Sequence, residues 1–565
     1  MRGSWFLVFW LLIVAILVVP ILLFLILGVS PKLFDQGDQW FTLDWLGQAL
    51  ASNQLVGFLH STLIGLVTAV IAAAVAFWMA WMVQRTDLPG RRVLSGTVFA
   101  LLLVPSYLVA LGWERLLEPN GVLQVMGWDA VWLRGVIYGP VGIVVVLVVK
   151  GIPFAFLAIS NALRGLGREF EDAVRVHGGS RAASIRMAVA LVSPGVWAAL
   201  AIVFAESVSD YGVASTLAND SHFLVATYAL YTAVDSNPIQ FPLASAISWV
   251  LLVLIVLALF AQYKALGGRS FRVLSARSHT IVREHLGKLR ATLHGTGVVV
   301  LVFCTLGVPA FGAVSASLID GLGSLNGSDQ VDLSNYARVL ASPDLAGPLE
   351  YSAWMSLLVA TVATILAVVC ARILANQGNT TTGRILDFVL LAAVALPGIV
   401  FASGYIFAYN LPFWNKLHIQ LYGTTTLLVF AYIATGLPST TRVLVGNMSQ
   451  VQNSLLEASQ VNGRSAMKSW GAIVLPIIAR PLLMAWLLTF AAILLELPVS
   501  QLLAPAGEAP ISVGIETALG KYDLGGGTAM EILAILFALA VIGIALAAFR
   551  FLTPKGWRVL GRTQS

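Results

Sequence analysis

The sequence is poor in charged residues. Only 11% of its 565 residues are Asp, Glu, Lys or Arg, whereas soluble domains carry about 25%. Hydrophobic residues make up 58% of the chain, more than a water-soluble fold of this size can bury. The composition excludes a soluble protein and predicts an all-α polytopic membrane protein, for which lipid is the solvent of most of the chain.

Cysteines and metal-ligand patterns are also scarce. The two cysteines, Cys304 and Cys370, both lie in apolar runs and predict neither a disulfide framework nor a metal cluster. No nucleophile–base pair, HExxH motif or cluster of acids predicts an active site. We expect no metal site and no cofactor bound by this chain, because the histidines on the predicted cytoplasmic side lack ligand spacing: His177, His279, His285 and His294.

A phosphate-binding loop is absent as well. The nearest fragments, "HLGKLR" and "ALGKYD", lack the upstream glycine and the Ser or Thr after lysine that hold phosphate and Mg²⁺. The sequence therefore predicts a protein that is not an enzyme. The segments between its apolar runs are too short to form a soluble domain that captures a substrate.

Long apolar runs are abundant, and each is long enough to cross the hydrocarbon core, which takes about 20 residues. The first run is too long for the apolar region of a cleaved signal, about 7–15 residues, and is interpreted as a membrane span. Twelve spans are predicted near 5–29, 55–83, 93–117, 136–163, 188–208, 243–263, 295–318, 351–375, 385–409, 424–446, 472–495 and 528–551.

The distribution of charge predicts the orientation. With a cytoplasmic N-terminus, the inner segments hold 25 of the 33 Lys and Arg residues but only six of the 27 Asp and Glu residues. Such a positive-inside bias places both termini in the cytoplasm. The net charge of +6 therefore reflects topology, and we expect no nucleic-acid partner.

The two halves of the chain resemble each other. "DYGVASTLA" at 210–218 aligns with "ELPVSQLLA" at 496–504, and further pairs recur at nearly the same offset: Gly90 and Gly383, Pro105 and Pro397, Gly112 and Gly404. Matching glycines and prolines at a near-constant offset favour an internal repeat. We predict two six-helix repeats, residues 1–263 and 295–565, joined by a basic cytoplasmic linker at 264–294.

Each half contains a polar segment broken by glycine. "EDAVRVHGGSRAASIRMAVALVSP" (171–194) aligns with "EASQVNGRSAMKSWGAIVLP" (457–476), so that Asp172 matches Glu457 and Gly178 matches Gly463 at an offset of 285. Each charge would cost about 2.5–3.5 kcal/mol at the bilayer centre, so both segments are expected outside the membrane. The glycine permits a sharp turn between two short amphipathic helices.

The second segment resembles the EAA loop of ABC-importer permeases, with Glu457, Ala458, Gly463, Ile473, Leu475 and Pro476 at the motif positions. The first copy is degenerate: Asp172 replaces the glutamate, Ala173 and Gly178 are kept, and the I-x-L-P end has become Ala188, Ala190 and Leu191. The resemblance implies a type I ABC importer permease fold in the bacterial inner membrane. It also implies two copies of an ABC ATPase subunit, which use ATP and Mg²⁺, and an extracytoplasmic substrate-binding protein.

Because both halves lie in one chain, the sequence looks most like the fused ferric-iron permeases, with "ESVSDYGVASTLA" and "ELPVSQLLAPAGEAPISVGIETALGKYD" carrying the likeness. Fused permeases for thiamine, aminoethylphosphonate or polyamines remain alternatives. A major-facilitator-type carrier is a further alternative, because "VQRTDLPGRR" partly resembles the pattern of its loop between spans two and three. Val83 and Leu88 depart from that pattern, and paired EAA loops have no role in such a carrier.

Four ionisable residues are candidates for the transport pathway or its gate. Lys150 lies near the middle of a predicted span, where a lysine is expensive, and either faces a cavity or pairs with Glu206 or Asp210. Asp210 and Glu496 are equivalent in the two repeats. They either line an acidic vestibule or cap the ends of spans. The adjacent Glu114 and Arg115 are expected to be interfacial anchors.

Overall fold

The structure is a computed structural model that describes residues 4–119, 121–164, 174, 176–265, 283–320, 322, 330–378 and 380–552. These residues form helices and no named strand; two isolated β-bridges are present. Most of the predicted linker lies outside the described residues.

Within the described ranges, ten helical segments are long and apolar enough to span a membrane. Three of them contain a π-helical turn. These are α1–η1–α2 (Ser4–Ile13, Val14–Val18, Val19–Leu27), α14–η4–α15 (Lys288–Val302, Phe303–Gly307, Val308–Leu318) and the segment Ala466–Leu494, in which the π-helical turn η5 (Trp470–Val474) directly precedes α24 (Leu475–Leu494). The others are α4 (Ser52–Arg85), α9 (Pro140–Arg164), α11 (Arg181–Ser209), α13 (Phe241–Ala265), α17 (Pro343–Gln377), α21 (Thr425–Met448) and α27 (Leu524–Leu552). They coincide with ten of the twelve predicted spans.

The other two predicted spans are bent helix pairs. α5 (Arg91–Leu103) and α6 (Ser106–Leu117) meet at 98°, and α18 (Thr381–Ala395) and α19 (Gly398–Tyr409) meet at 108°. Pro105 and Pro397 lie at the two breaks, and the residue before each proline is extended. Proline disfavours the helical conformation of its predecessor, so the prolines that identified the repeat also break these spans.

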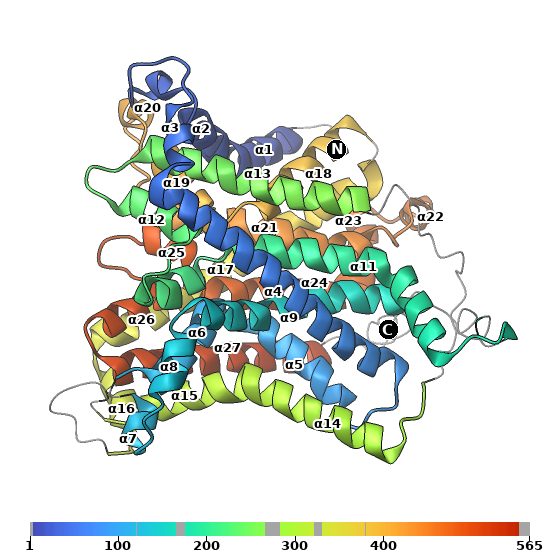
Figure 1. The fold of residues 1–565 in the computed structure, drawn as a ribbon. Helices are drawn as coiled ribbons and strands as arrows, with labels where there is room; N and C mark the ends of the chain where they lie inside the picture. Colours follow the sequence, from blue (N-terminus) through green and yellow to red (C-terminus); the bar gives the residue numbers. More distant parts are fainter. Residues whose placement is uncertain are drawn as a thin grey trace. The chain divides into compact units, whose positions relative to one another are not determined.

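Short helices connect the spans. They are η2 (Pro31–Phe34), α3 (Asp44–Ala49), α7 (Val122–Val125), α8 (Val131–Ile137), η3 (Ala214–Ala218), α12 (Ala226–Asp235), α16 (Ser334–Ala341), α20 (Pro412–Lys416), α22 (Asn453–Val461), α23 (Ala466–Ser469), η5 (Trp470–Val474), α25 (Pro498–Leu503) and α26 (Ile511–Gly520). Within the second half of the chain, α16 and α26 lie at the opposite end of the long helices from α22 and α23 (Figure 1).

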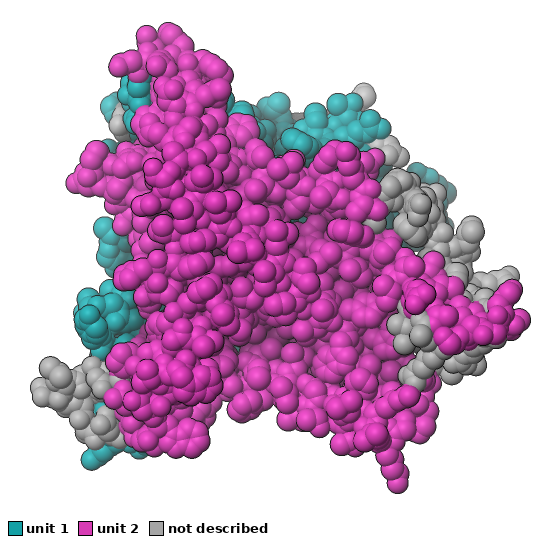
Figure 2. All heavy atoms as spheres, in the orientation of Figure 1, with its two compact units in different colours: residues 1–27, 33–37, 317–565 teal, residues 28–32, 38–316 magenta. Residues whose placement is uncertain are grey.

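The chain forms two compact units, coloured separately in Figure 2. Unit 1 comprises residues 1–27, 33–37 and 317–565, and unit 2 comprises residues 28–32 and 38–316. The first long helix of each predicted repeat therefore belongs to the unit formed mainly by the other repeat. The units divide the chain differently from the predicted sequence repeats.

The matched glycines Gly112 and Gly404 lie against the first long helix of the other repeat. In unit 2, a Cβ atom on Gly112 would lie 2.5 Å from the carbonyl oxygen of Pro309 in α15. In unit 1, a Cβ atom on Gly404 would lie 3.0 Å from the carbonyl oxygen of Pro20 in α2. The hydroxyl of Tyr405 donates to the carbonyl of Ile16 in η1 at 2.8 Å. Glycine permits this close backbone approach without displacing the neighbouring helix, so its recurrence in both repeats has the same structural reason.

Candidate functional site: polar loops and buried ion pairs

The second polar loop folds as two short helices joined by a turn at Gly463. α22 ends at Val461, Gly463 has φ +80°, and α23 begins at Ala466. The hydroxyl of Ser465 accepts the Lys468 amide, which caps α23. Gly463 is in the left-handed region that L side chains rarely adopt, so it permits the abrupt change of direction. The chain then continues through η5 into α24 without a further break.

The surface of this loop is apolar at several exposed positions. α22 buries none of its residues, and Glu457 and Ala458 are both exposed. The side chains of Val461 and Met467 are 88% and 87% exposed, although both are hydrophobic. Exposed apolar side chains next to charged ones are typical of an interaction surface.

The first polar loop repeats the turn as far as it is described. Asp172 and Ala173 lie outside the described residues. Gly178 has φ +72°, and Ser180 caps α11 by accepting the Ala183 amide at 3.3 Å. The exposed side chain of Val176 lies two residues before the glycine.

The offset of 285 that relates Gly178 to Gly463 also relates Val176 to Val461 and Ser180 to Ser465. Val461 lies on the apolar face expected of the amphipathic helix before Gly463. Val176 and the two serine caps were missed in the sequence, although the common offset was a signal for them.

Lys150 of α9 forms an ion pair with Asp210, which follows α11. The Nζ–Oδ2 distance is 3.0 Å, and the Asp210 side chain is only 2% exposed. Asp210 also accepts the Ser106 hydroxyl at 2.7 Å and the Val213 amide at 2.8 Å. Of the two partners proposed for Lys150, the structure selects Asp210 and not Glu206. The pair joins α9 and α11 to the N-terminus of α6.

Glu496 occupies the equivalent position in the second repeat and caps a helix in the same way. Its carboxylate accepts the amides of Val499 at 2.9 Å and Ser500 at 3.0 Å, at the start of α25. Val213 and Val499 are related by the same offset of 286 as Asp210 and Glu496. Both acids therefore cap short helices, η3 and α25, whereas the sequence left open an acidic vestibule or caps at the ends of spans.

The two acids differ in their cationic partner. Lys150 has Thr435 as its counterpart at an offset of 285, the offset that also relates Pro153 to Pro438. Among the described residues, Glu496 has no ion-pair partner, and its carboxylate is held by amide and hydroxyl donors. The repeat preserves the cap but not the ion pair.

The sequence is similar to one protein-family model and to several permeases of known transport systems. Residues 75–269 match the family model described as "Binding-protein-dependent transport system inner membrane component". The ferric transport system permease protein FbpB of Actinobacillus pleuropneumoniae is 24% identical over 513 residues, which cover 87% of this chain and 70% of that protein. The putative FbpB 1 of Haemophilus influenzae is 24% identical over 514 residues, covering 87% and 77%. The sulfate permease CysT of Escherichia coli is 26% identical over 241 residues, covering 42% and 86%.

The protein resembles fused ABC-importer permeases of the ferric-iron subgroup. The all-helical fold with ten to twelve candidate spans agrees with a type I importer permease, and it makes the chain a multi-pass inner-membrane protein. Proteins of this kind are transport components rather than ATPases, and they work with ATPase and substrate-binding partners.

Glu114 and Arg115 are not interfacial anchors as the sequence suggested. They are 2% and 5% exposed, and Arg115 pairs with Glu118 at 2.5 Å. The chain bends by 98° near Pro105 and α6 packs inside unit 2, so the two side chains are enclosed. The composition of the sequence did not predict in which direction α6 runs after the bend.

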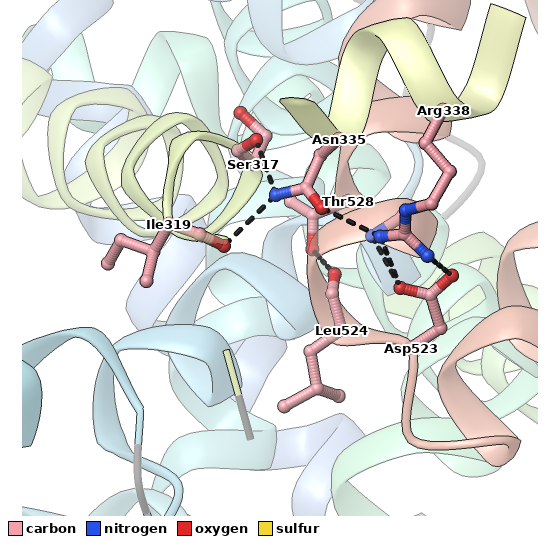
Figure 3. Close-up of polar contacts among 8 residues, drawn as sticks. Ser317, Ile319, Asn335, Arg338, Asp523, Leu524 and Thr528 are labelled. Atoms are coloured by element: carbon pink, nitrogen blue, oxygen red, sulfur yellow. Dashed lines mark hydrogen bonds and ion pairs between the residues drawn. The ribbon is translucent and has the colours of Figure 1, made fainter. Parts of the chain in front are cut away.

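A polar network in unit 1 was also missed (Figure 3). The buried amide of Asn335 donates to the carbonyls of Ser317 and Ile319 at 3.1 and 3.0 Å, which fixes the C-terminal end of α15 against α16. Arg338 forms a bidentate ion pair with Asp523 at 2.6 and 2.9 Å, just before α27. Asp523 is 185 residues from Arg338 in the sequence, which is why spacing alone did not indicate the network.

The loop between α4 and α5 binds the end of the linker. Asp87 accepts the Leu286 amide at 2.9 Å and contacts the imidazole of His285 at 2.5 Å. The backbone hydrogen bond and the His285 contact lower the pKa of Asp87 below its usual value. Among the described residues, no group of three or more His, Cys, Asp or Glu side chains is arranged to hold a metal ion.

Proposed function

We propose that this protein imports ferric iron as the permease of an ATP-driven transporter, by alternating access between two halves. The importer class is given by the family resemblance. Iron as the cargo is supported by the two relatives that match 87% of the chain, both named as ferric transport permeases. Sulfate, molybdenum and trehalose permeases also match, over shorter parts of the chain. The choice of iron as the cargo therefore needs its own test.

The observation that carries the mechanism is the pair of glycine turns at Gly178 and Gly463, each beside an exposed valine. Two equivalent surfaces suit two copies of an ATPase subunit, one per loop. Asp172, Ala173, Glu457 and Ala458 would contact these subunits, and closure of the ATPases would draw the loops together. The halves would then open outward to receive iron from a substrate-binding protein.

The ion pair and the caps suit a structural role beside the pathway. Lys150, Glu206, Asp210 and Glu496 would keep the broken helices α6 and α19 rigid while the halves move. In this arrangement the loops and both termini face the cytoplasm, as the charge bias indicates.

The experiment is transport in proteoliposomes that contain this chain, its ATPase and its binding protein. We expect ferric-iron uptake that requires ATP, with no uptake of thiamine, aminoethylphosphonate or polyamine. Proton-driven flux without ATP would instead favour a major-facilitator-type carrier. ATP-dependent uptake of a different cargo would refute only the iron assignment.

The double variant Gly178→Val and Gly463→Val tests the loops. A β-branched side chain in the left-handed region costs at least about 1–2 kcal/mol at each turn. Among the described residues, no atom lies within 4 Å of either added Cβ, so the strain falls on the backbone of the turn. We expect loss of substrate-stimulated ATP turnover with normal membrane insertion. The matched control is Gly178→Asn and Gly463→Asn, because asparagine tolerates this conformation, and turnover that is equal in both pairs would contradict the proposed coupling.

A further inference from the structure

A long groove lies within unit 1 between α17 and α24. Its volume is about 1340 Å³, and residues of α23 and η5, together with Phe549 of α27, complete its wall. Most of the lining is large and apolar, including Ile365, Val368, Leu482 and Trp486. Helix-docking faces in membranes are instead rich in small residues that let backbones approach. The bulky lining favours a flexible apolar occupant over another helix.

The polar groups of the groove gather at one end. Arg372, Asn376 and Gln377 occupy the last turns of α17, whereas the lining of α17 before them is aliphatic apart from Thr361 and Thr364. The Arg372 guanidinium donates to the side-chain oxygen of Asn453 at 2.8 Å, and no carboxylate within the described part of the chain pairs with it. The groove is therefore mainly apolar, with Arg372 at one end as a cation that lacks a carboxylate partner among the described residues.

The length of the groove matches the thickness of one leaflet of the hydrocarbon core. Eleven residues separate Thr361 from Arg372, which at about 1.5 Å per residue is about 16 Å. Half of a hydrocarbon core of about 30 Å is about 15 Å. An amphiphile anchored at Arg372 would thus extend its chain to the middle of the membrane.

We propose that this groove binds an anionic phospholipid of the surrounding bilayer, with its phosphate at Arg372 and an acyl chain between α17 and α24. A guanidinium binds phosphate through two parallel hydrogen bonds, and basic pockets between membrane helices suit lipid headgroups. Met467, Trp470 and Gly471, which follow the turn at Gly463, also line the groove. The bound lipid would therefore contact the second polar loop.

The test measures lipid retention by the purified full-length chain in detergent. Phosphatidylglycerol and phosphatidylcholine with the same acyl chains are titrated, and bound lipid is counted by native mass spectrometry. We expect one phosphatidylglycerol to be retained about tenfold more tightly than phosphatidylcholine, the difference expected of a charge-assisted contact. Arg372→Gln should abolish this preference, and Val368→Trp, which fills the groove, should weaken binding of both lipids.

Two control variants match these changes outside the groove. Arg384→Gln removes an exposed cation from α18, and Val394→Trp adds the same bulk to an exposed position of that helix. Both should retain phosphatidylglycerol like the unmodified chain, and equal elution volumes and helix content would establish that all variants fold. If Val368→Trp does not fold, comparison of Arg372→Gln with Arg384→Gln still tests whether lipid binds at Arg372.

Three outcomes would overturn the proposal. The first is equal retention of the two lipids by the unmodified chain. The second is a loss of retention in Arg384→Gln as large as in Arg372→Gln. The third is a mass step equal to a second copy of the chain, abolished by Val368→Trp, which would assign the groove to self-association.

Discussion

At the scale of single residues, the ionisable side chains that were unusual in the sequence form ion pairs or helix caps in the structure. Lys150 stood out because a lysine in the middle of a span is expensive. The ion pair with Asp210 offsets that cost, and Asp210 in turn receives hydrogen bonds from Ser106 and Val213. A side chain that looks functional by its position alone thus has a sufficient structural reason.

The ion pair predicts non-additive effects of substitution. Lys150→Met leaves a carboxylate that is 2% exposed without its cation, while the lysine side chain itself is 29% exposed. Breaking a fully buried pair costs about 3–5 kcal/mol, and we expect a smaller cost here. Asp210→Asn leaves the lysine unpaired but preserves part of the cap. We expect the double variant to be more stable than Lys150→Met alone, measured as melting temperatures in a double-mutant cycle. Strictly additive changes would show that the two side chains do not stabilise each other.

At the scale of helices, proline and glycine decide how the spans are shaped. Pro105 and Pro397 were visible in the sequence as repeat markers, and their structural effect is to bend two spans by about a right angle. Gly112 and Gly404 were visible in the same way, and they provide close contact with α15 and α2. The positions were therefore predictable, whereas the contacts they serve needed the fold.

A substitution at Gly112 tests the close contact. Gly112→Ala places a Cβ atom 2.5 Å from the Pro309 carbonyl oxygen, so the backbone of α15 or α6 must shift. We expect a lower melting temperature, with a cost of about 1–3 kcal/mol for overpacking. Gly96→Ala on α5 is the control, because nothing lies within 4 Å of its added Cβ and alanine is the better helix former. The contact would be unimportant if both variants melted at the same temperature.

At the scale of the whole molecule, charge predicts how the chain lies in the membrane. The loops at Gly178 and Gly463 and the linker end at His285 all fall in segments rich in Lys and Arg, whereas Gly507 falls in a predicted outer segment. The compact units show which helices pack together, and they carry no information on which side is cytoplasmic.

Labelling of single cysteines tests this orientation. In a chain with Cys304 and Cys370 replaced, we expect Ser459→Cys and His285→Cys to react with a membrane-impermeant maleimide only in inside-out vesicles. Gly507→Cys should react only in right-side-out vesicles or intact spheroplasts. The reverse pattern would invert the topology and remove the loops from the reach of any cytoplasmic ATPase.

The sequence by itself determined the solvent, the helical class, most of the spans and the position of the two polar loops. These properties depend on local composition, on hydrophobic length and on residues repeated at a fixed offset. Only the tertiary structure decided that Lys150 pairs with Asp210, that two spans are bent, and that the first helix of each repeat packs with helices of the other repeat. Those outcomes depend on contacts between segments distant in the chain, such as Gly112 with Pro309, whose geometry no local pattern contains.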